Sequence, residues 1–168
     1  DPARYEPSRP LYRLYEPLIV WLDLAGWQPV THAVTTSPGL LIERYGPGAK
    51  ALAAVTFIAL RNPGKEAVVT GVRVADKACP ETLPAGLPAH DEAIAWLLLA
   101  DRPAEAARGG NGWEVGGVTV PADGTEVVAI ARRGDLARLW LNEAQQWFER
   151  LAKEGRWLGS GDGAAVVA

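Results

Sequence analysis

The apolar pattern of this chain changes period near Gly26, and this change limits the fold more than any other feature of the sequence. Before Gly26, apolar residues recur every three or four positions, as on one face of a helix. From residue 27 to residue 131 they fall in short runs with a period of two, and turns rich in proline and glycine separate the runs. Such a pattern is typical of antiparallel strands, not of alternating βα units. We therefore expect a mainly β domain.

The period-two region predicts an antiparallel β-sandwich of about seven strands. The β-rich runs cover residues 30–34, 40–44, 52–60, 68–74, 94–100, 113–120 and 126–131. Asn62-Pro63-Gly64 lies between the third and fourth runs, where proline presets a turn and glycine accepts positive φ. The sequence thus predicts a hairpin that pairs 52–60 with 68–74.

Two helices are predicted to flank the sandwich. The first has Leu14, Leu18 and Leu22 on its apolar face and ends at Gly26, while Pro17 should kink it or mark a second start. The second follows an N-cap at Asp135 and ends near residue 155. Its apolar stripe is formed by Leu136, Trp140, Ala144, Trp147 and Leu151. We therefore divide the chain into 1–27 (extended lead-in and helix), 28–131 (sandwich) and 132–168 (helix and glycine-rich tail).

Composition excludes several classes of protein. The 168 residues suit one hydrophobic core, and a net charge of −3 argues against a broad nucleic-acid footprint. The longest uncharged apolar stretch, 52–60, is too short to span a bilayer as a helix. Zinc-type spacing of His and Cys is missing from the sequence, and we expect no metal and no cofactor.

The start of the sequence suggests processing. The chain begins at Asp1 and contains no methionine. It is either the product of cleavage, such as removal of a secretory leader, or part of a longer protein. We expect it outside the cell or on the cell surface. Missing Met, few Asn and abundant Pro, Arg and Glu are a compositional hint of a heat-adapted source.

Residues with catalytic potential are few and scattered. His32 lies in a predicted strand and His90 in a predicted loop, so both are best interpreted as structural or solvated. The lone Cys79 has no evident histidine partner, which a nucleophilic thiol would need. Glu43 and Glu114 lie on separate predicted strands, and nothing pairs them as glycoside hydrolysis requires. We identify no catalytic residue.

Seven tryptophans are the most unusual feature of the composition. They could form a carbohydrate-stacking platform or a protein interface. Trp140 and Trp147 fall on the stripe of the second helix and are interface candidates, together with Leu14, Leu18 and Leu22. Trp113 and Trp157 adjoin glycine-rich segments, so we expect them to be exposed and name them as candidate ligand-binding residues.

Part of the sequence resembles a known family. The segments Leu11-Tyr12-Arg13-Leu14-Tyr15-Glu16-Pro17-Leu18-Ile19, Ala25-Gly26-Trp27-Gln28-Pro29-Val30-Thr31-His32-Ala33, Ile42-Glu43-Arg44-Tyr45-Gly46 and Arg61-Asn62-Pro63 carry the resemblance. Together they are similar to the C-terminal region of TIM-barrel glycoside-hydrolase-like proteins of bacteria and archaea. There, a late barrel helix with an internal proline leads into a β-sandwich. The resemblance covers about residues 11–63.

This resemblance implies a role without catalysis. The catalytic carboxylates of such proteins lie on barrel strands, which this chain lacks, so none can be assigned here. The chain would then be a non-catalytic portion of a carbohydrate-active protein, associated with its barrel. The alternative is a secreted structural or assembly subunit that binds itself or a partner protein through its sandwich and its Trp-rich helix. A free-standing hydrolase is the least favoured hypothesis.

Overall fold

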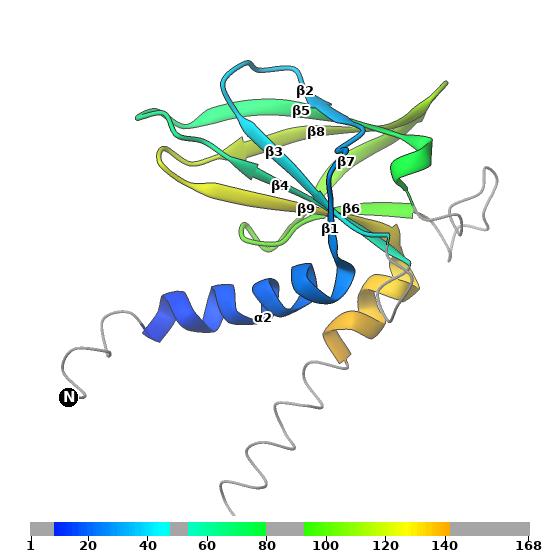
Figure 1. Cartoon of the computed structure of the whole chain (residues 1–168), viewed down its shortest axis with the longest axis horizontal. Coiled ribbons are helices and arrows are strands. Elements are labelled where there is room, and N and C mark those ends of the chain that lie inside the picture. The colour runs from blue at the N-terminus through cyan, green and yellow to red at the C-terminus, as the bar shows by residue number, and fades with distance from the viewer. Residues whose placement is uncertain (1–8, 48–53, 80–92, 142–168) are drawn as a thin grey trace, which may run out of the picture. The chain divides into compact units, whose positions relative to one another are not determined.

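The computed structural model describes residues 9–47, 54–79 and 93–141 (Figure 1). The chain separates into two compact units, 1–135 and 136–168, and the strands that the structure describes belong to the first. Among the described helices, none combines the length and the apolar character needed to cross a membrane. The predicted stripe residues Ala144, Trp147 and Leu151 lie outside the described residues.

The predicted N-terminal helix is α2, Arg9–Ala25. It continues through Pro17 as one helix of 17 residues, so the expectation of a second start is wrong. Proline removes one backbone donor, and α2 tolerates this loss. The helix ends as predicted at Gly26, which has a φ of 81° and donates its N–H to the Leu22 carbonyl at 3.0 Å. Glycine adopts this left-handed conformation without steric cost.

The structure confirms a mainly β, antiparallel fold. The described residues form nine strands in one curled half-barrel instead of about seven in a sandwich. The strands are β1 (Trp27–Gln28), β2 (Ala33–Thr35), β3 (Leu41–Tyr45), β4 (Val55–Arg61), β5 (Val68–Ala75), β6 (Ala93–Leu97), β7 (Arg102–Gly109), β8 (Gly112–Val120) and β9 (Thr125–Arg132). A short 3-10 helix, η2 (Asp76–Ala78), follows β5. The sequence did not predict β1 or β7.

Strand β7 joins the two halves of the sheet. The order is β1-β3-β4-β9-β6-β7-β8-β5-β2, and every neighbouring pair is antiparallel. The first three residues of β7 pair with β6, and its last five pair with β8. One strand therefore continues the hydrogen bonding around the bend, so the sheet curls without a break.

The predicted hairpin between residues 52–60 and 68–74 is wrong. β4 pairs with β3 and β9, whereas β5 pairs with β8 and β2 (Figure 1). The segment after Arg61 is therefore an arch from one half of the sheet to the other. The chain does turn at Asn62-Pro63-Gly64, as predicted. The turn, however, connects the two halves of the sheet instead of two neighbouring strands.

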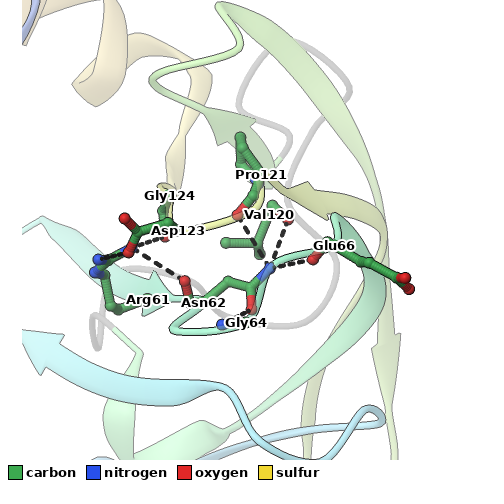
Figure 2. Close-up of polar contacts among 8 residues, drawn as sticks. All are labelled: Arg61, Asn62, Gly64, Glu66, Val120, Pro121, Asp123 and Gly124. Carbon is green, nitrogen blue, oxygen red and sulfur yellow. Dashed lines mark hydrogen bonds and ion pairs between the residues drawn. The ribbon is translucent and has the colours of Figure 1, made fainter.

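The side chain of Asn62 explains this arch (Figure 2). It is only 3% exposed, and its Nδ2 group donates to the carbonyls of Glu66 at 2.8 Å, Pro121 at 3.0 Å and Val120 at 3.3 Å. Its Oδ1 atom accepts the Gly64 N–H at 2.9 Å. Asn62 thus fastens the β4–β5 arch to the β8–β9 connection, which crosses between the same two layers.

A second set of bonds holds these two connections together. Arg61 donates to the carbonyl of Gly124 at 3.0 Å and forms an ion pair with Asp123. The backbone N–H of Asn62 also donates to the Gly124 carbonyl, at 2.9 Å. The 123–124 turn therefore receives donors from both the backbone and the side chains of the arch.

The core lies between the two halves of the sheet. β4, β6 and β9 contribute one side, and β5 and β8 contribute the other. Fully burying one such aliphatic or aromatic side chain contributes about 1.5–3 kcal/mol. The core residues are Ala33, Ile58, Leu60, Val72, Val74, Ala78, Cys79, Ala95, Leu97, Trp113, Val115, Val118, Val120, Val128 and Ile130.

The second predicted helix begins earlier than expected. Residues 133–141 are helical, so Asp135 lies in the first turn and is not the N-cap. Its carboxylate accepts a hydrogen bond from Arg132 Nε at 2.7 Å. A carboxylate is favourable at this end of a helix because of the helix dipole, which is why the position resembles a cap in the sequence.

Candidate functional site

Arg44 on β3 is bonded to the segment before β2, in which His32 lies. Arg44 is 7% exposed, and its guanidinium donates to the carbonyls of Val30 at 2.9 and 3.1 Å and of Gly46 at 2.8 Å. The His32 carbonyl accepts the Ala75 N–H at 2.9 Å. The chain before β2 is thus held between β3 and β5. Arg44 acts here as a structural clamp, because its bonded groups are backbone carbonyls.

The local environment opposes acid–base chemistry by His32. Partial burial lowers its pKa, and the positive charges of Lys77 and Arg44 lower it further. Its φ of 49° is unusual for a residue other than glycine. No carboxylate is hydrogen-bonded to His32 within the described part of the chain, so the structure offers no reactive pair there.

Cys79 is buried at the end of η2, with an exposed fraction of 6%. Burial raises the pKa of its thiol to about 11, and the negative charge of Asp76 adds to this effect. The cations Arg108 and Arg44 act in the opposite direction and do not overcome it. Because the thiolate is the nucleophile, a protonated and buried thiol is inert.

Glu126 is a buried carboxylate that the sequence analysis missed. It is 2% exposed on β9, and it accepts N–H groups from Leu99 at 2.9 Å, Ala100 at 3.1 Å and Val127 at 2.9 Å. Burial raises its pKa, while these hydrogen bonds and Arg102 oppose the rise. The only sequence signal is its place at the start of an apolar run. Glu126 stabilises the turn between β6 and β7, since every N–H that it binds belongs to that turn or to β9.

The two carboxylates considered from the sequence do not converge. Glu43 is exposed on β3 and accepts the hydroxyl of Tyr45 at 3.0 Å. Glu114 lies on β8 and forms an exposed ion pair with Arg73 at 3.0 Å. Across the described ranges, no group of three potential metal ligands was found, and His90 lies outside those ranges.

The tryptophan predictions need correction. Trp113 is only 9% exposed, because its position on β8 faces the core. The expectation that its ring is exposed is therefore wrong, and its position gives no support to sugar stacking. Trp27 on β1, which we did not single out, is 58% exposed. Trp140 is half-buried, whereas Trp147 and Trp157 lie outside the described residues.

Exposed apolar side chains gather at the N-terminal end of the described chain. Twelve large apolar residues are exposed in the described part of the chain, and eight of them lie between residues 11 and 30. Six of them belong to α2, and we call this set the α2 surface. It consists of Leu11, Tyr12, Leu14, Ile19, Val20 and Leu24.

Two residues of the α2 surface, Leu11 and Leu14, extend a line of residues that is buried further along the helix. Leu18 and Ala25 are buried and Leu22 is half-buried, and all three follow one side of α2. Leu11 and Leu14 continue that side toward the N-terminus, where they are 58% and 44% exposed. The predicted interface residues Leu14, Leu18 and Leu22 therefore share a side, but only Leu14 among them is exposed.

Other sides of α2 are apolar too. Ile19 is 61% exposed, Val20 48% and Leu24 47%, and none of them lies on the buried line. The exposed acidic residues Glu16 and Asp23 lie on the same part of the helix surface as these three residues. A helix that is apolar around most of its circumference is typical of a buried position. Its exposure here marks α2 as the best candidate for an interaction surface.

Comparison with known proteins found no protein-family model, no curated protein and no solved structure that matches this chain.

Proposed function

We propose that this chain is a non-catalytic β module of a carbohydrate-active, glycoside-hydrolase-like protein, and that α2 docks it on a protein surface. The α2 surface is the observation that supports docking. Six large apolar side chains exposed on one helix are unfavourable in water, and contact with another protein would remove them from it. The carbohydrate-active context rests only on the resemblance of residues 11–63.

The titratable groups support a role without catalysis. Among the described residues, Cys79 is protonated at neutral pH, and Arg44 and Glu126 are bonded to the backbone. Glu43 and Glu114 bind separate partners, Tyr45 and Arg73. A catalytic site requires such groups to meet in one place. A structural or assembly subunit is the second candidate function, since the same α2 surface would serve that role.

Native purification with paired variants tests the docking proposal. The double variant Ile19→Glu/Leu24→Glu places two charges on the α2 surface. Its matched control, Leu41→Glu/Val69→Glu, makes the same change at two exposed sheet residues. We expect a partner chain to co-purify with the wild type and the control and to be lost from the α2 variant. Equal recovery from both variants would contradict docking through α2.

The carbohydrate context has a separate test. We expect polysaccharide pull-down to retain the complex with its partner, because the catalytic or binding surface belongs to that partner. Retention should depend on the α2 residues Ile19 and Leu24. If no glycan retains the complex or the free chain, the carbohydrate-active part of the proposal fails, while docking through α2 is judged by the purification alone.

A further inference from the structure

We propose that Trp27, Tyr45 and Glu43 form a saccharide-binding platform at the edge of the sheet, where a pyranose ring stacks on the aromatic side chains and donates a hydroxyl to the carboxylate. We call these three residues the β1–β3 platform. The inference deepens the carbohydrate-active part of the proposed function and rests on it only for the choice of ligand. The platform shares no residue with the α2 surface.

The pairing of β1 with β3 brings the three side chains to one face of the sheet. Trp27 lies directly opposite Tyr45, and residues in this relation share a face. Glu43 precedes Tyr45 by two positions on β3, so it faces the same side. That side is the outer one, because Tyr45 also lies opposite Phe57, whereas the adjacent Ile58 belongs to the core.

The carboxylate of Glu43 is oriented and can accept a further hydrogen bond. Tyr45 donates its hydroxyl to Glu43 Oε2 at 3.0 Å, and among the described residues this is the only hydrogen bond to Glu43. Burial raises the pKa of Tyr45, and the hydrogen bond to Glu43 raises it further, so the hydroxyl stays a donor at neutral pH. Glu43 Oε1 can therefore accept a hydroxyl of a ligand.

The backbone around Trp27 is held on both sides. Trp27 is 58% exposed, and the other tryptophans whose side chains are described are buried or half-buried. Before it, the Gly26 carbonyl accepts the Gly46 N–H at 2.9 Å. After it, the Val30 carbonyl accepts two hydrogen bonds from Arg44. A fixed backbone lowers the entropy that a ligand must overcome on binding.

A saccharide matches these groups in chemistry and in shape. The axial C–H bonds of a pyranose with equatorial hydroxyls make a flat apolar face that packs on an aromatic ring, while its hydroxyls donate to a carboxylate. A quaternary ammonium also binds aromatic rings, and the sites that recognise it are cages of such rings. Two aromatic neighbours on one face of a sheet leave an open surface instead, which favours a stacked sugar.

We expect this binding to be weak. One stacked ring and a few hydrogen bonds bury little surface, so the dissociation constant should be on the order of 1 mM. An affinity of this size does not retain the free chain in a pull-down. Retention of the complex therefore still reports on its partner.

NMR titration of the free full chain with cellohexaose tests the platform, because its β-linked glucose units carry equatorial hydroxyls. The indole signal of Trp27, assigned by its loss in Trp27→Phe, should shift and saturate. Trp27→Ala should bind at least about tenfold more weakly and Glu43→Gln about three- to tenfold more weakly, measured at the backbone amides of β3. Val34→Ala, at an equally exposed position on β2, is the matched control and should bind within about twofold of the wild type. Circular dichroism confirms that each variant is folded.

Three results would overturn the inference. The first is a Trp27 signal that does not move up to the solubility limit of cellohexaose. The second is unchanged binding by both Trp27→Ala and Glu43→Gln. The third is tighter binding of tetramethylammonium than of cellohexaose, which would identify a cation site.

The platform and the proposed function can fail separately. If the Trp27 signal does not respond but glycans retain the complex, the platform fails and the carbohydrate-active context is upheld. If the signal responds but Ile19→Glu/Leu24→Glu loses no partner, the platform is upheld and docking through α2 fails.

Discussion

Replacing Asn62 tests the arch that sets the topology of the sheet. Asn62→Ala removes two N–H donors and one acceptor from a site that is 3% exposed. A net value of about 1 kcal/mol for each of these hydrogen bonds gives a loss of roughly 3 kcal/mol in the free energy of unfolding. The melting temperature should fall by roughly 10 °C for a domain of this size.

Asn62→Asp is the matched control, because it keeps the shape of the side chain and the acceptor for Gly64. It loses both donors and places a carboxylate against carbonyls of Glu66 and Pro121. We expect Asn62→Asp to be less stable than the alanine variant at pH 7, and we expect its free energy of unfolding to increase as the pH falls. Protonation restores a donor, and burial among carbonyls raises the pKa of the new carboxyl in the folded state.

Urea unfolding, followed by tryptophan fluorescence, measures both variants. The free energy of unfolding should change while its dependence on urea concentration stays constant. If both variants lie within about 0.5 kcal/mol of the wild type, as ordinary surface substitutions do, the arch does not depend on Asn62 and the reasoning is refuted.

Two further predictions concern buried titratable groups. Because the folded state raises the pKa of Glu126, folding takes up a proton there, so its contribution to stability falls as the pH rises above the ordinary glutamate value of about 4.3. Glu126→Gln should flatten this part of the pH–stability curve, and an unchanged curve would refute the assignment. Cys79, with a thiol pKa of about 11, should react with a thiol reagent at pH 8 only after denaturant unfolds the chain. Rapid labelling of the folded chain would contradict its burial.

Local sequence patterns located most of the elements. The run of period-three and period-four leucines identified α2, and Gly26 marked its end. The runs at 68–74, 113–120 and 126–131 agree with β5, β8 and β9 to within one residue at each end. These segments are rich in β-branched residues, which favour strands, so local preference and tertiary packing agree.

Features that depend on distant partners were missed. β7 contains Pro103, Glu105 and three alanines, which have low strand preference, and it is a strand because β6 and β8 pair with it on either side. The turn at Asn62 is evident from the sequence, but its connection to Val120 and Pro121 is not. That long-range contact decides whether the turn makes a hairpin or an arch.

The sequence predicted a partner for the side of α2 that carries Leu14, Leu18 and Leu22. Leu18 is buried within this chain and Leu22 is half-buried, so most of the exposed apolar residues of α2 lie elsewhere on the helix. The need for a partner stays a prediction. Burial of individual tryptophans could not be predicted, because glycine-rich neighbours suggested exposure for Trp113 while its position on β8 faces inward. Trp27 is exposed on a two-residue strand that has no clear sequence pattern.

Hydrogen–deuterium exchange of α2 in the associated protein tests most directly whether this helix is an interface. Peptides covering residues 11–24 should exchange slowly in the wild type and at least tenfold faster in Ile19→Glu/Leu24→Glu, while peptides from β4 and β9 remain equally protected in both. If residues 11–24 exchange at the same rate in both proteins, α2 is not the docking element.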